Sequence, residues 1–310
     1  YRENTEEKDA AFLKLYDGHD WKWFAVRLKH TDMEYLRKHW SGKKASAPTL
    51  EKKHDKYFLR FTYAEEVSLN RTPVKEQTIC SVDLGINTDA VCTIMRPDGT
   101  ILGRKFINFP SDKDRMYRVL GRIRRFQREH GSRQVQGRWA YAKRLNTELG
   151  KKIAREIVFY ASENRADVIV FEYLEMKGKL SGKKKQKLQM WKKRDIQKRC
   201  GQQAHRKGIR ISRICAWNTS RLAFDGSGKI DRDIQDHRLC TLQNGKRYNC
   251  DLSASYNIGA RYFIREILKP LPATERSLLE AKVPAVKRRT SCVYADLRDL
   301  ISEMELRKAA

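Results

Sequence analysis

The chain has 310 residues, of which 40% are hydrophobic, so it can bury a sizeable core and has room for two domains. Its 66 Lys and Arg against 38 Asp and Glu give a formal net charge of +28, which predicts a polyanionic partner, nucleic acid before a membrane surface. No apolar run reaches the roughly 18 residues of a membrane span and no signal-like stretch follows the N-terminus, so we expect no membrane attachment and a cytoplasmic location.

Residues 1–76 have the pattern of a small β segment followed by a linker. The aromatic-rich segments WKWFAVRL (21–28) and KYFLRFTYAEEV (56–67) predict two strands. In the second segment, alternation places Tyr57, Leu59, Phe61 and Tyr63 on one face. Pro73 marks the linker. We therefore predict part of a β-barrel over this region.

From residue 79 the pattern changes to strands and helices of an α/β domain. The predicted strands are 79–86, 90–96, 101–109, 166–174 and 209–217, and the predicted helices are two within 112–164, joined near 130–137, followed by 188–207, 251–268 and 294–307. PDGT (97–100) is a hairpin signal. Three strands followed by alternating helices and strands are the element order of an α/β, ribonuclease H-like fold.

Three carboxylates interrupt apolar elements of this predicted domain. Asp83 lies in the first strand, Glu172 ends the fourth, and Asp251 opens the helix 251–268. In a ribonuclease H-like order they are candidates to converge at one end of the sheet. Oxygen ligands suit Mg²⁺, with Mn²⁺ as a substitute, and two ions ~3.5–4 Å apart can clamp a phosphodiester.

Each carboxylate also has a simpler interpretation when it is taken alone. Asp251 could be the N-cap of its helix, Glu172 a surface acid at a strand end, and Asp83 a former of the turn at GINTD. Together the three favour a shared metal site. The simpler interpretations would require three carboxylates to interrupt three apolar elements for unrelated reasons.

Three segments carry a resemblance to a known family. VDLGIN (82–87), VFEYL (170–174) and DLSASYNIGAR (251–261) resemble the three RuvC motifs of the transposon-encoded TnpB nucleases and the compact type V CRISPR effectors. The resemblance extends from about residue 20 to 270, and KGIRISRICAWNTS (207–220) is similar to the strand before the family's zinc-binding insert. Cut-and-paste transposases of the same fold have their Glu as the last of the three acids along the chain, whereas here Glu172 lies between Asp83 and Asp251. This order favours the nuclease family over the transposases.

The resemblance implies an RNA-guided DNA endonuclease, a hydrolase of phosphodiester bonds. It makes Asp83, Glu172 and Asp251 the catalytic and metal-binding residues, with two Mg²⁺ ions as cofactors. A guide RNA and the target DNA would be the partners, in a prokaryotic cytoplasm and on the nucleoid when the protein is bound to DNA.

The resemblance also implies a division of the chain into four segments. Residues 1–76 correspond to part of a wedge-like domain, 77–217 to the first part of a RuvC-like nuclease domain, 218–250 to a zinc-finger-like insert, and 251–310 to the last part of the nuclease domain with a tail. A chain that begins on Tyr1 is expected to lack an N-terminal part of such a protein.

The insert departs from the family, which usually has two CxxC pairs there. RLAFDGSG (221–228) contains no cysteine, and only Cys240 and Cys250 remain. A zinc site built from these two with Cys215 and His237 would have an unusual spacing. We therefore predict a loop or hairpin without structural zinc, placed as a lid beside Asp251. The seven dispersed cysteines are expected to be reduced.

Two strongly basic stretches flank the predicted metal site in the sequence. Residues 177–199 hold eleven Lys or Arg against one acid, and residues 113–133 hold eight against two. Such stretches are often merely solvated, but the second keeps an apolar stripe that can dock a helix while its arginines face phosphates. The predicted nucleic-acid contacts are Arg118, Arg122, Arg125, Lys183, Lys184, Lys185, Trp191, Lys192, Lys193 and Arg194.

Three functions are compatible with this sequence. The first is RNA-guided DNA cleavage, the second is RNA-guided DNA binding with weak or no cleavage, and the third is an unguided nuclease or resolvase on the same fold. The three intact carboxylates favour the first over the second, and the net charge of +28 favours it over the third. Monomer and dimer both stay open.

Overall fold

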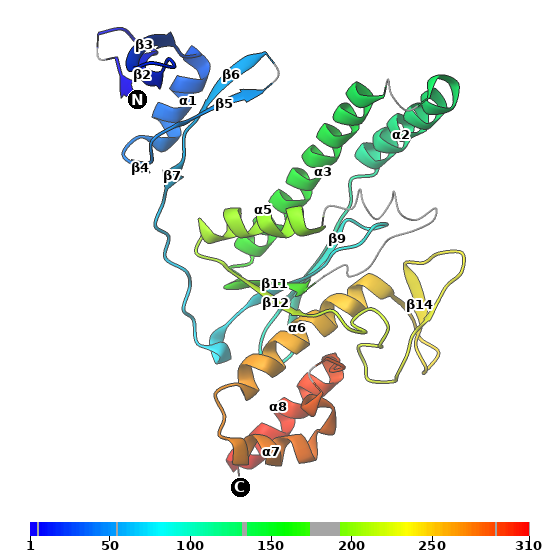
Figure 1. Ribbon diagram of the computed structural model, residues 1–310. Helices are drawn as coiled ribbons and strands as arrows, with labels where there is room; N and C mark the ends of the chain where they lie inside the picture. Colours follow the sequence, from blue (N-terminus) through cyan, green and yellow to red (C-terminus); the bar gives the residue numbers. More distant parts are fainter. Residues whose placement is uncertain (5, 54, 132–134, 174–192, 289, 310) are drawn as a thin grey trace. The chain divides into compact units, whose positions relative to one another are not determined.

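The computed structural model describes residues 1–4, 6–53, 55–131, 135–173, 193–288 and 290–309 (Figure 1). It divides into two compact units, Tyr1–Val67 and Ser68–Ala310. Within the described ranges, no helix combines the length and the apolar character that crossing a membrane requires.

The first unit combines short sheets with one helix. Strands β1 (Arg2–Glu3), β2 (Ala10–Tyr16) and β3 (Trp21–Arg27) form an antiparallel sheet, α1 spans His30–Trp40, and two further pairs join β4 (Lys44–Ala45) to β7 (Tyr63–Ala64) and β5 (Thr49–Lys53) to β6 (Lys56–Arg60). The strand predicted at 21–28 is confirmed as β3. The strand predicted at 56–67 is broken into β6 and β7, and Tyr57 is 66% exposed.

The second unit is a mixed α/β domain built on a five-stranded sheet with the order β10-β9-β8-β11-β12. Its strands are β8 (Ile79–Asp83), β9 (Ala90–Met95), β10 (Ile101–Ile107), β11 (Val168–Tyr173) and β12 (Arg210–Cys215). The first three are antiparallel, and β8–β11 and β11–β12 are parallel. All five predicted strands are confirmed in the predicted chain order.

Helices connect the strands and cover both faces of the sheet (Figure 1). They are α2 (Pro110–His130), α3 (Gln136–Glu163), α5 (Lys193–His205), α6 (Cys250–Leu268), α7 (Ala273–Lys282) and α8 (Tyr294–Ala309), with short 3₁₀ turns at Val74–Glu76 and Pro284–Lys287. The predicted pair within 112–164 is confirmed as α2 and α3. Helix α7 was not predicted, because its ten residues carry only a short apolar pattern.

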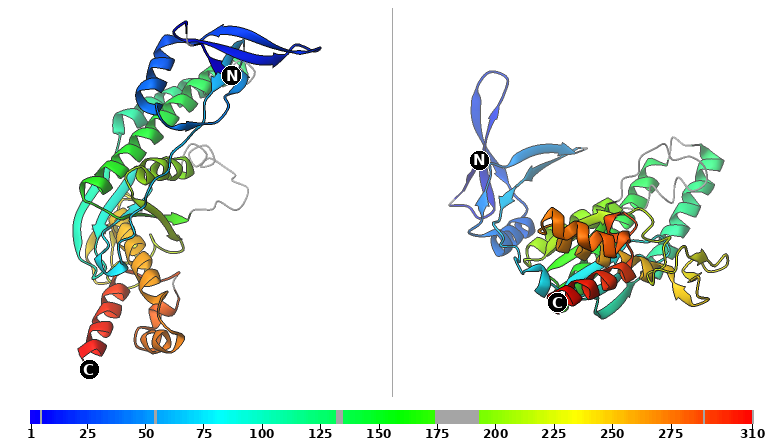
Figure 2. Two further views of the ribbon diagram at one scale, coloured as in Figure 1. Left: turned by 90° about the vertical axis from the view of Figure 1, so that its left-hand side faces the viewer. Right: turned by 90° about the horizontal axis from the view of Figure 1, so that it is seen from below.

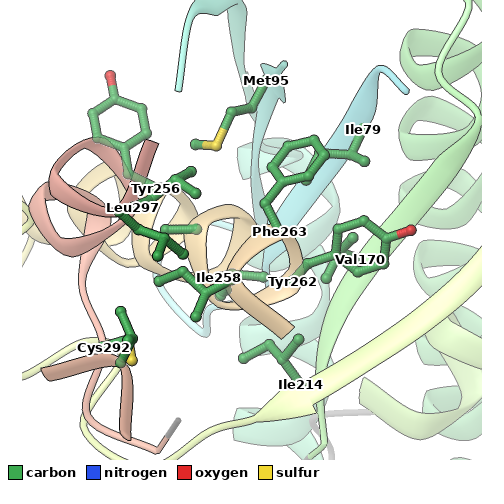
Figure 3. Packing of buried hydrophobic residues seen from close by; sticks show 14 of the residues in the cluster. Ile79, Met95, Val170, Ile214, Tyr256, Ile258, Tyr262, Phe263, Cys292 and Leu297 are labelled. Carbon is green, nitrogen blue, oxygen red and sulfur yellow. The ribbon is translucent and has the colours of Figure 1, made fainter. Parts of the chain in front are cut away.

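The two faces of the sheet follow from alternation along β8. Cys80 and Val82 pack against α3 and α5, whereas Ile79 packs against α6 (Figure 3). Strands β8 and β9 are buried along their whole length, as is usual for a sheet covered on both faces. Helix α6 is buried nearly all round, because α8 covers the side that does not face the sheet.

The predicted loop or hairpin at 218–250 is a three-stranded antiparallel sheet at the N-terminal end of α6 (Figure 2). Its strands are β13 (Asp231–Arg232), β14 (Leu239–Thr241) and β15 (Arg247–Asn249). Cys240 and Cys250 pack with Ala223 and Leu242 in a separate apolar cluster. All seven cysteines of the chain are free thiols.

Candidate active site

Period-two alternation places two of the predicted carboxylates on one face of the sheet. In β8, Asp83 follows Ile79 by four residues, and in β11, Glu172 follows Val168 by four residues. Ile79 and Val168 both face α6, so the two carboxylates lie on that same face. The parallel register pairs Phe171 with Val82, so the next position sets Glu172 beside Asp83. Both carboxylates are only 8% exposed.

Helix α6 brings the third carboxylate to the same place. Asp251 lies in its first turn, and the N-cap is Asn249, whose side chain accepts a hydrogen bond from the Leu252 backbone N–H at 2.9 Å. The alternative interpretation of Asp251 as a helix cap is therefore wrong. Its carboxylate is free of the capping role and lies close enough to Asp83 to raise the pKa of that side chain.

The three acids form an electrostatically strained cluster. Burial raises the pKa of Asp83 well above its ordinary value, and the charges of Glu172 and Asp251 raise it further. Burial also raises the pKa values of Glu172 and Asp251. Arg232 of the insert lowers the pKa of Asp83, and the same charge acts on Asp251.

Glu172 is held by the segment that enters the insert. The Thr219 hydroxyl donates a hydrogen bond to Glu172 Oε1, and the Gln197 side chain donates to the Glu172 backbone carbonyl at 3.0 Å. Thr219 is buried and therefore has a fixed position. The positive charges of Arg261 and Lys193 lower the pKa of Glu172 and partly offset its burial.

Two polar residues of α6 fix the segment that carries Thr219. Asn257 Nδ2 donates to the carbonyls of Thr219 and Leu222 at 3.0 and 2.9 Å. Arg261 Nη1 donates to the carbonyls of Cys215 and Trp217 at 2.9 and 2.7 Å. One helix thus carries Asp251 and also sets the position of the residue that orients Glu172.

The turn after β8 has its own requirement for glycine. A Cβ on Gly85 would lie 2.5 Å from the Thr88 carbonyl oxygen, which is closer than real Cβ atoms approach backbone. Thr88 also contacts the site, because its side-chain hydrogen bond lowers the pKa of Asp251. Gly85 therefore allows the tight turn that brings Thr88 to this carboxylate.

The site suits a hard cation by its donor chemistry but not by its present side-chain positions. Among the residues that the structure describes, no three His, Cys, Asp or Glu side chains are grouped so that they could hold a metal ion. Thr219 and Thr88 instead hold Glu172 and Asp251. The donors are nevertheless all carboxylate oxygens with raised pKa values, which a divalent cation would stabilise in the ionised form.

The predicted nucleic-acid contacts fall into three groups. Arg118, Arg122 and Arg125 lie on the exposed side of α2, and Arg194 is exposed in α5. Lys193 differs from the expectation of a surface contact, because it is buried at the start of α5 with its charge near Glu172. Lys183, Lys184, Lys185, Trp191 and Lys192 lie outside the described residues.

Sequence reasoning missed the polar residues that support the carboxylates: Thr88, Thr219, Arg232, Arg238, Asn257 and Arg261. A signal was present in α6, where Asn257 and Arg261 lie within the largely apolar run 256–264. Buried polar side chains need hydrogen-bond partners, so their presence in such a helix marks a polar network.

If Glu172 holds a catalytic metal ion, as the resemblance implies, replacing Thr219 by Val should lower the cleavage rate about 10- to 100-fold, the usual effect of removing a group that orients a metal ligand. Valine keeps the volume but removes the hydroxyl that donates to Glu172. The measurement is the initial cleavage rate as a function of Mg²⁺ concentration, and the half-saturating concentration should rise. Thr219→Ser should restore both values, and a serine variant as impaired as the valine variant would contradict the orienting role.

No protein-family model matches the chain. No curated protein matches it either. Among solved structures it is similar to a Cas12f1–sgRNA–target DNA complex (18% identity, TM-score 0.48, 67% of this chain and 54% of that chain), a CRISPR-Cas12f ternary complex (16%, 0.44, 76% and 49%) and a Cas12i–crRNA–dsDNA complex (11%, 0.46, 98% and 53%). The chain spans about half the length of each of these proteins.

Proposed function

We propose that this chain is the nuclease portion of an RNA-guided DNA endonuclease of the TnpB and compact type V CRISPR effector kind. The observation that carries the proposal is the meeting of Asp83, Glu172 and Asp251 at one end of the sheet. Asp83 and Glu172 are buried there, and the charges of Glu172 and Asp251 raise the pKa of Asp83 beyond the effect of its burial. A protein retains such a cluster at a cost in stability, which is characteristic of functional sites.

The topology of the second unit supports a RuvC-like domain with a ribonuclease H-like fold. Three antiparallel strands are followed by two parallel ones, with β8 in the centre of the sheet. The carboxylates come from the central strand, from its parallel neighbour β11 and from α6. Under this proposal the first unit belongs to a wedge-like domain, and 218–250 is an insert over the nuclease site.

Asp83, Glu172 and Asp251 would hold the divalent ions. Bound Mg²⁺ or Mn²⁺ supplies a water of lowered pKa and neutralises the charge on the phosphate oxygens. Thr219 orients Glu172, and Thr88 orients Asp251. Arg232 and Arg238 place positive charge near the carboxylates, where it can attract the phosphate of the bound strand.

The proposed partners are a guide RNA and the DNA that pairs with it. The net charge of +28 and the exposed arginines of α2 provide contacts to phosphates, which bind without reading the sequence. Target choice would then come from base pairing with the guide.

A plasmid cleavage assay tests the proposal. The full chain is purified with its co-expressed RNA and incubated with supercoiled plasmid that carries the matching target, in Mg²⁺ or in EDTA. We expect nicked and linear products only with Mg²⁺ and only before treatment with ribonuclease. Cleavage that survives ribonuclease would remove RNA guidance and leave the unguided nuclease.

A second candidate function is RNA-guided DNA binding with weak or no cleavage. One observation favours it: Thr219 and Thr88 engage Glu172 and Asp251, and the described acidic side chains form no ready metal-ligand group. Target binding in a gel-shift experiment, with no nicking in either Mg²⁺ or Mn²⁺, would establish this alternative.

A further inference from the structure

The described residues leave a cavity of about 780 Å³ beside the carboxylate cluster, between α2, α3 and the insert loop 235–238. Its floor is apolar and is formed by Leu120 of α2, Leu149 and Ile153 of α3, and Ile196 of α5. Its charged lining is mixed, with the cations Lys113, Arg124 and Arg238 and the acids Asp89, Asp114 and Asp236. A cavity of this size with an apolar lining and a few polar groups is typical of a small-ligand site.

The cavity lies next to the candidate active site. Gly85 forms part of its wall, and the position of the Cβ that this residue lacks is 3.8 Å from Asp251 Oδ2. Arg238 lines the cavity too, and its charge acts on Asp251. A group bound in the cavity is therefore next to any phosphate held by the carboxylates.

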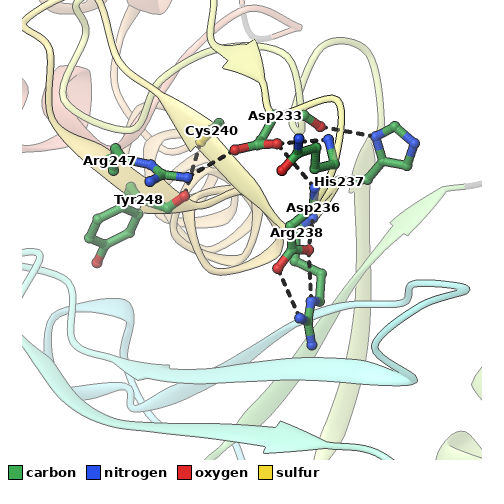
Figure 4. Close-up of polar contacts among 8 residues, drawn as sticks. Asp233, Asp236, His237, Arg238, Cys240, Arg247 and Tyr248 are labelled. Atoms are coloured by element: carbon green, nitrogen blue, oxygen red, sulfur yellow. Dashed lines mark hydrogen bonds and ion pairs between the residues drawn. The ribbon is translucent and has the colours of Figure 1, made fainter.

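The walls of the cavity are fixed by hydrogen bonds (Figure 4). Asp233 accepts bonds from the backbone N–H groups of Gln235 and Asp236 at 2.8 and 3.0 Å, and Asp236 accepts a bond from Arg238 Nη2 at 2.8 Å. On the opposite side, Lys113 pairs with Asp89 at 3.1 Å. The cavity is preformed, so binding needs little further ordering of the protein.

The lining distinguishes between the parts of a nucleotide. Phosphate cannot contact the apolar lining without losing its hydration, so we place it with the cationic side chains Arg124 and Arg238, the second of which is paired with Asp236. A nucleobase has an apolar face and polar edges, which match the leucine and isoleucine floor and the side-chain amide of Asn87. Tyr117, 72% exposed, adds an aromatic ring at the entrance.

We propose that this cavity receives one unstacked nucleobase of the strand being cut, from the nucleotide next to the scissile phosphate. A base held there cannot remain paired or stacked, so the cavity makes cleavage depend on an unpaired nucleotide at that one position. The identity of the strand rests on the proposed function, whereas the binding of a base does not.

The first experiment uses cleavage to locate the nucleotide whose base enters the cavity. The full chain with its RNA and Mg²⁺ cuts an end-labelled single strand, and the products are compared with those of the same strand carrying one abasic nucleotide. We expect the band for cleavage at one bond adjoining the abasic nucleotide to be about tenfold weaker than the same band from the unmodified strand, which leaves a gap in the cleavage ladder. Leu120→Trp, which fills the cavity, should weaken all bands about tenfold and remove the gap, and Leu278→Trp, at an exposed site in α7, should change neither.

The second experiment needs neither cleavage nor a variant. A single strand carrying 5-iodouracil is irradiated with the full chain in EDTA, and the crosslinked residue is identified by mass spectrometry. Crosslinking at Tyr117 supports the base site even where no cleavage occurs. The crosslinking result therefore tests the base site independently of the proposed nuclease function. Cleavage with an even ladder, or crosslinks confined to residues outside the cavity, would overturn the proposal.

Discussion

Replacing Asp83 by Asn is expected to abolish cleavage and to stabilise the protein in the absence of divalent ions. The activity should fall at least about 10³-fold, because the central ligand of the proposed metal site loses its charge. The stability should rise above pH 7, because the variant no longer buries a carboxylate beside Glu172 and Asp251. Opposite effects on activity and stability are the signature of a residue kept for function.

The pH dependence of this effect has a definite sign. The pKa of Asp83 is raised above its ordinary value of 3.8, so the folded chain keeps this proton to higher pH than the unfolded chain does. Stability without metal is therefore lost as the pH rises above about 4, until the folded carboxyl has ionised. The variant should lose less stability over the same range, and Mg²⁺ should stabilise the wild type more than the variant.

Thermal unfolding in EDTA and in Mg²⁺, from pH 5 to pH 8, measures these differences. Asp299→Asn, at an exposed position of α8, is the matched control and should leave the activity unchanged. An Asp83→Asn protein that is less stable than the wild type at pH 8 in EDTA would show that the carboxylate cluster is not strained.

Replacing Arg261 by Met is expected to cost about 3 kcal/mol or more of folding stability, because each buried carbonyl left without a donor costs about 1–3 kcal/mol. The Arg261 side chain is 3% exposed and donates to the carbonyls of Cys215, Trp217 and Cys292 at 2.7 to 2.9 Å. Methionine has a similar length but donates no hydrogen bond, so three buried carbonyls lose a donor. Cleavage should also fall, because the segment that positions Thr219 loosens.

Urea unfolding followed by circular dichroism measures the stability of this variant. Arg265→Met, one turn further along α6, is the matched control. Its guanidinium also donates to strand β12, at the Arg213 carbonyl, but the side chain is 31% exposed, so we expect a loss of about 1 kcal/mol or less. Equal losses in the two variants would contradict the clamping role of Arg261.

The sheet of the second unit was predictable because local pattern and tertiary environment agree there. Strands β8 and β9 are continuous apolar runs, and period two alone sets Asp83 and Glu172 on the face that α6 covers. The first unit was less predictable. Its strands expose aromatic side chains such as Trp21 and Tyr57, so the apolar pattern there does not report burial.

The support of the carboxylates could not be read from local pattern. Thr219 contacts Glu172, and Asn257 and Arg261 contact backbone carbonyls, across separations of 31 to 47 residues along the chain. Backbone carbonyls leave no trace in the sequence. Lys193 lies in a run of cations, so composition predicts the same nucleic-acid contact for it as for its neighbours. The structure instead buries it near Glu172.

Both ends of the insert adjoin a member of the carboxylate cluster. At one end, Thr219 hydrogen bonds to Glu172, and at the other end, Asp251 directly follows Cys250, whose side chain belongs to the insert's apolar cluster. A movement of the insert would therefore change the surroundings of Glu172 and of Asp251 together.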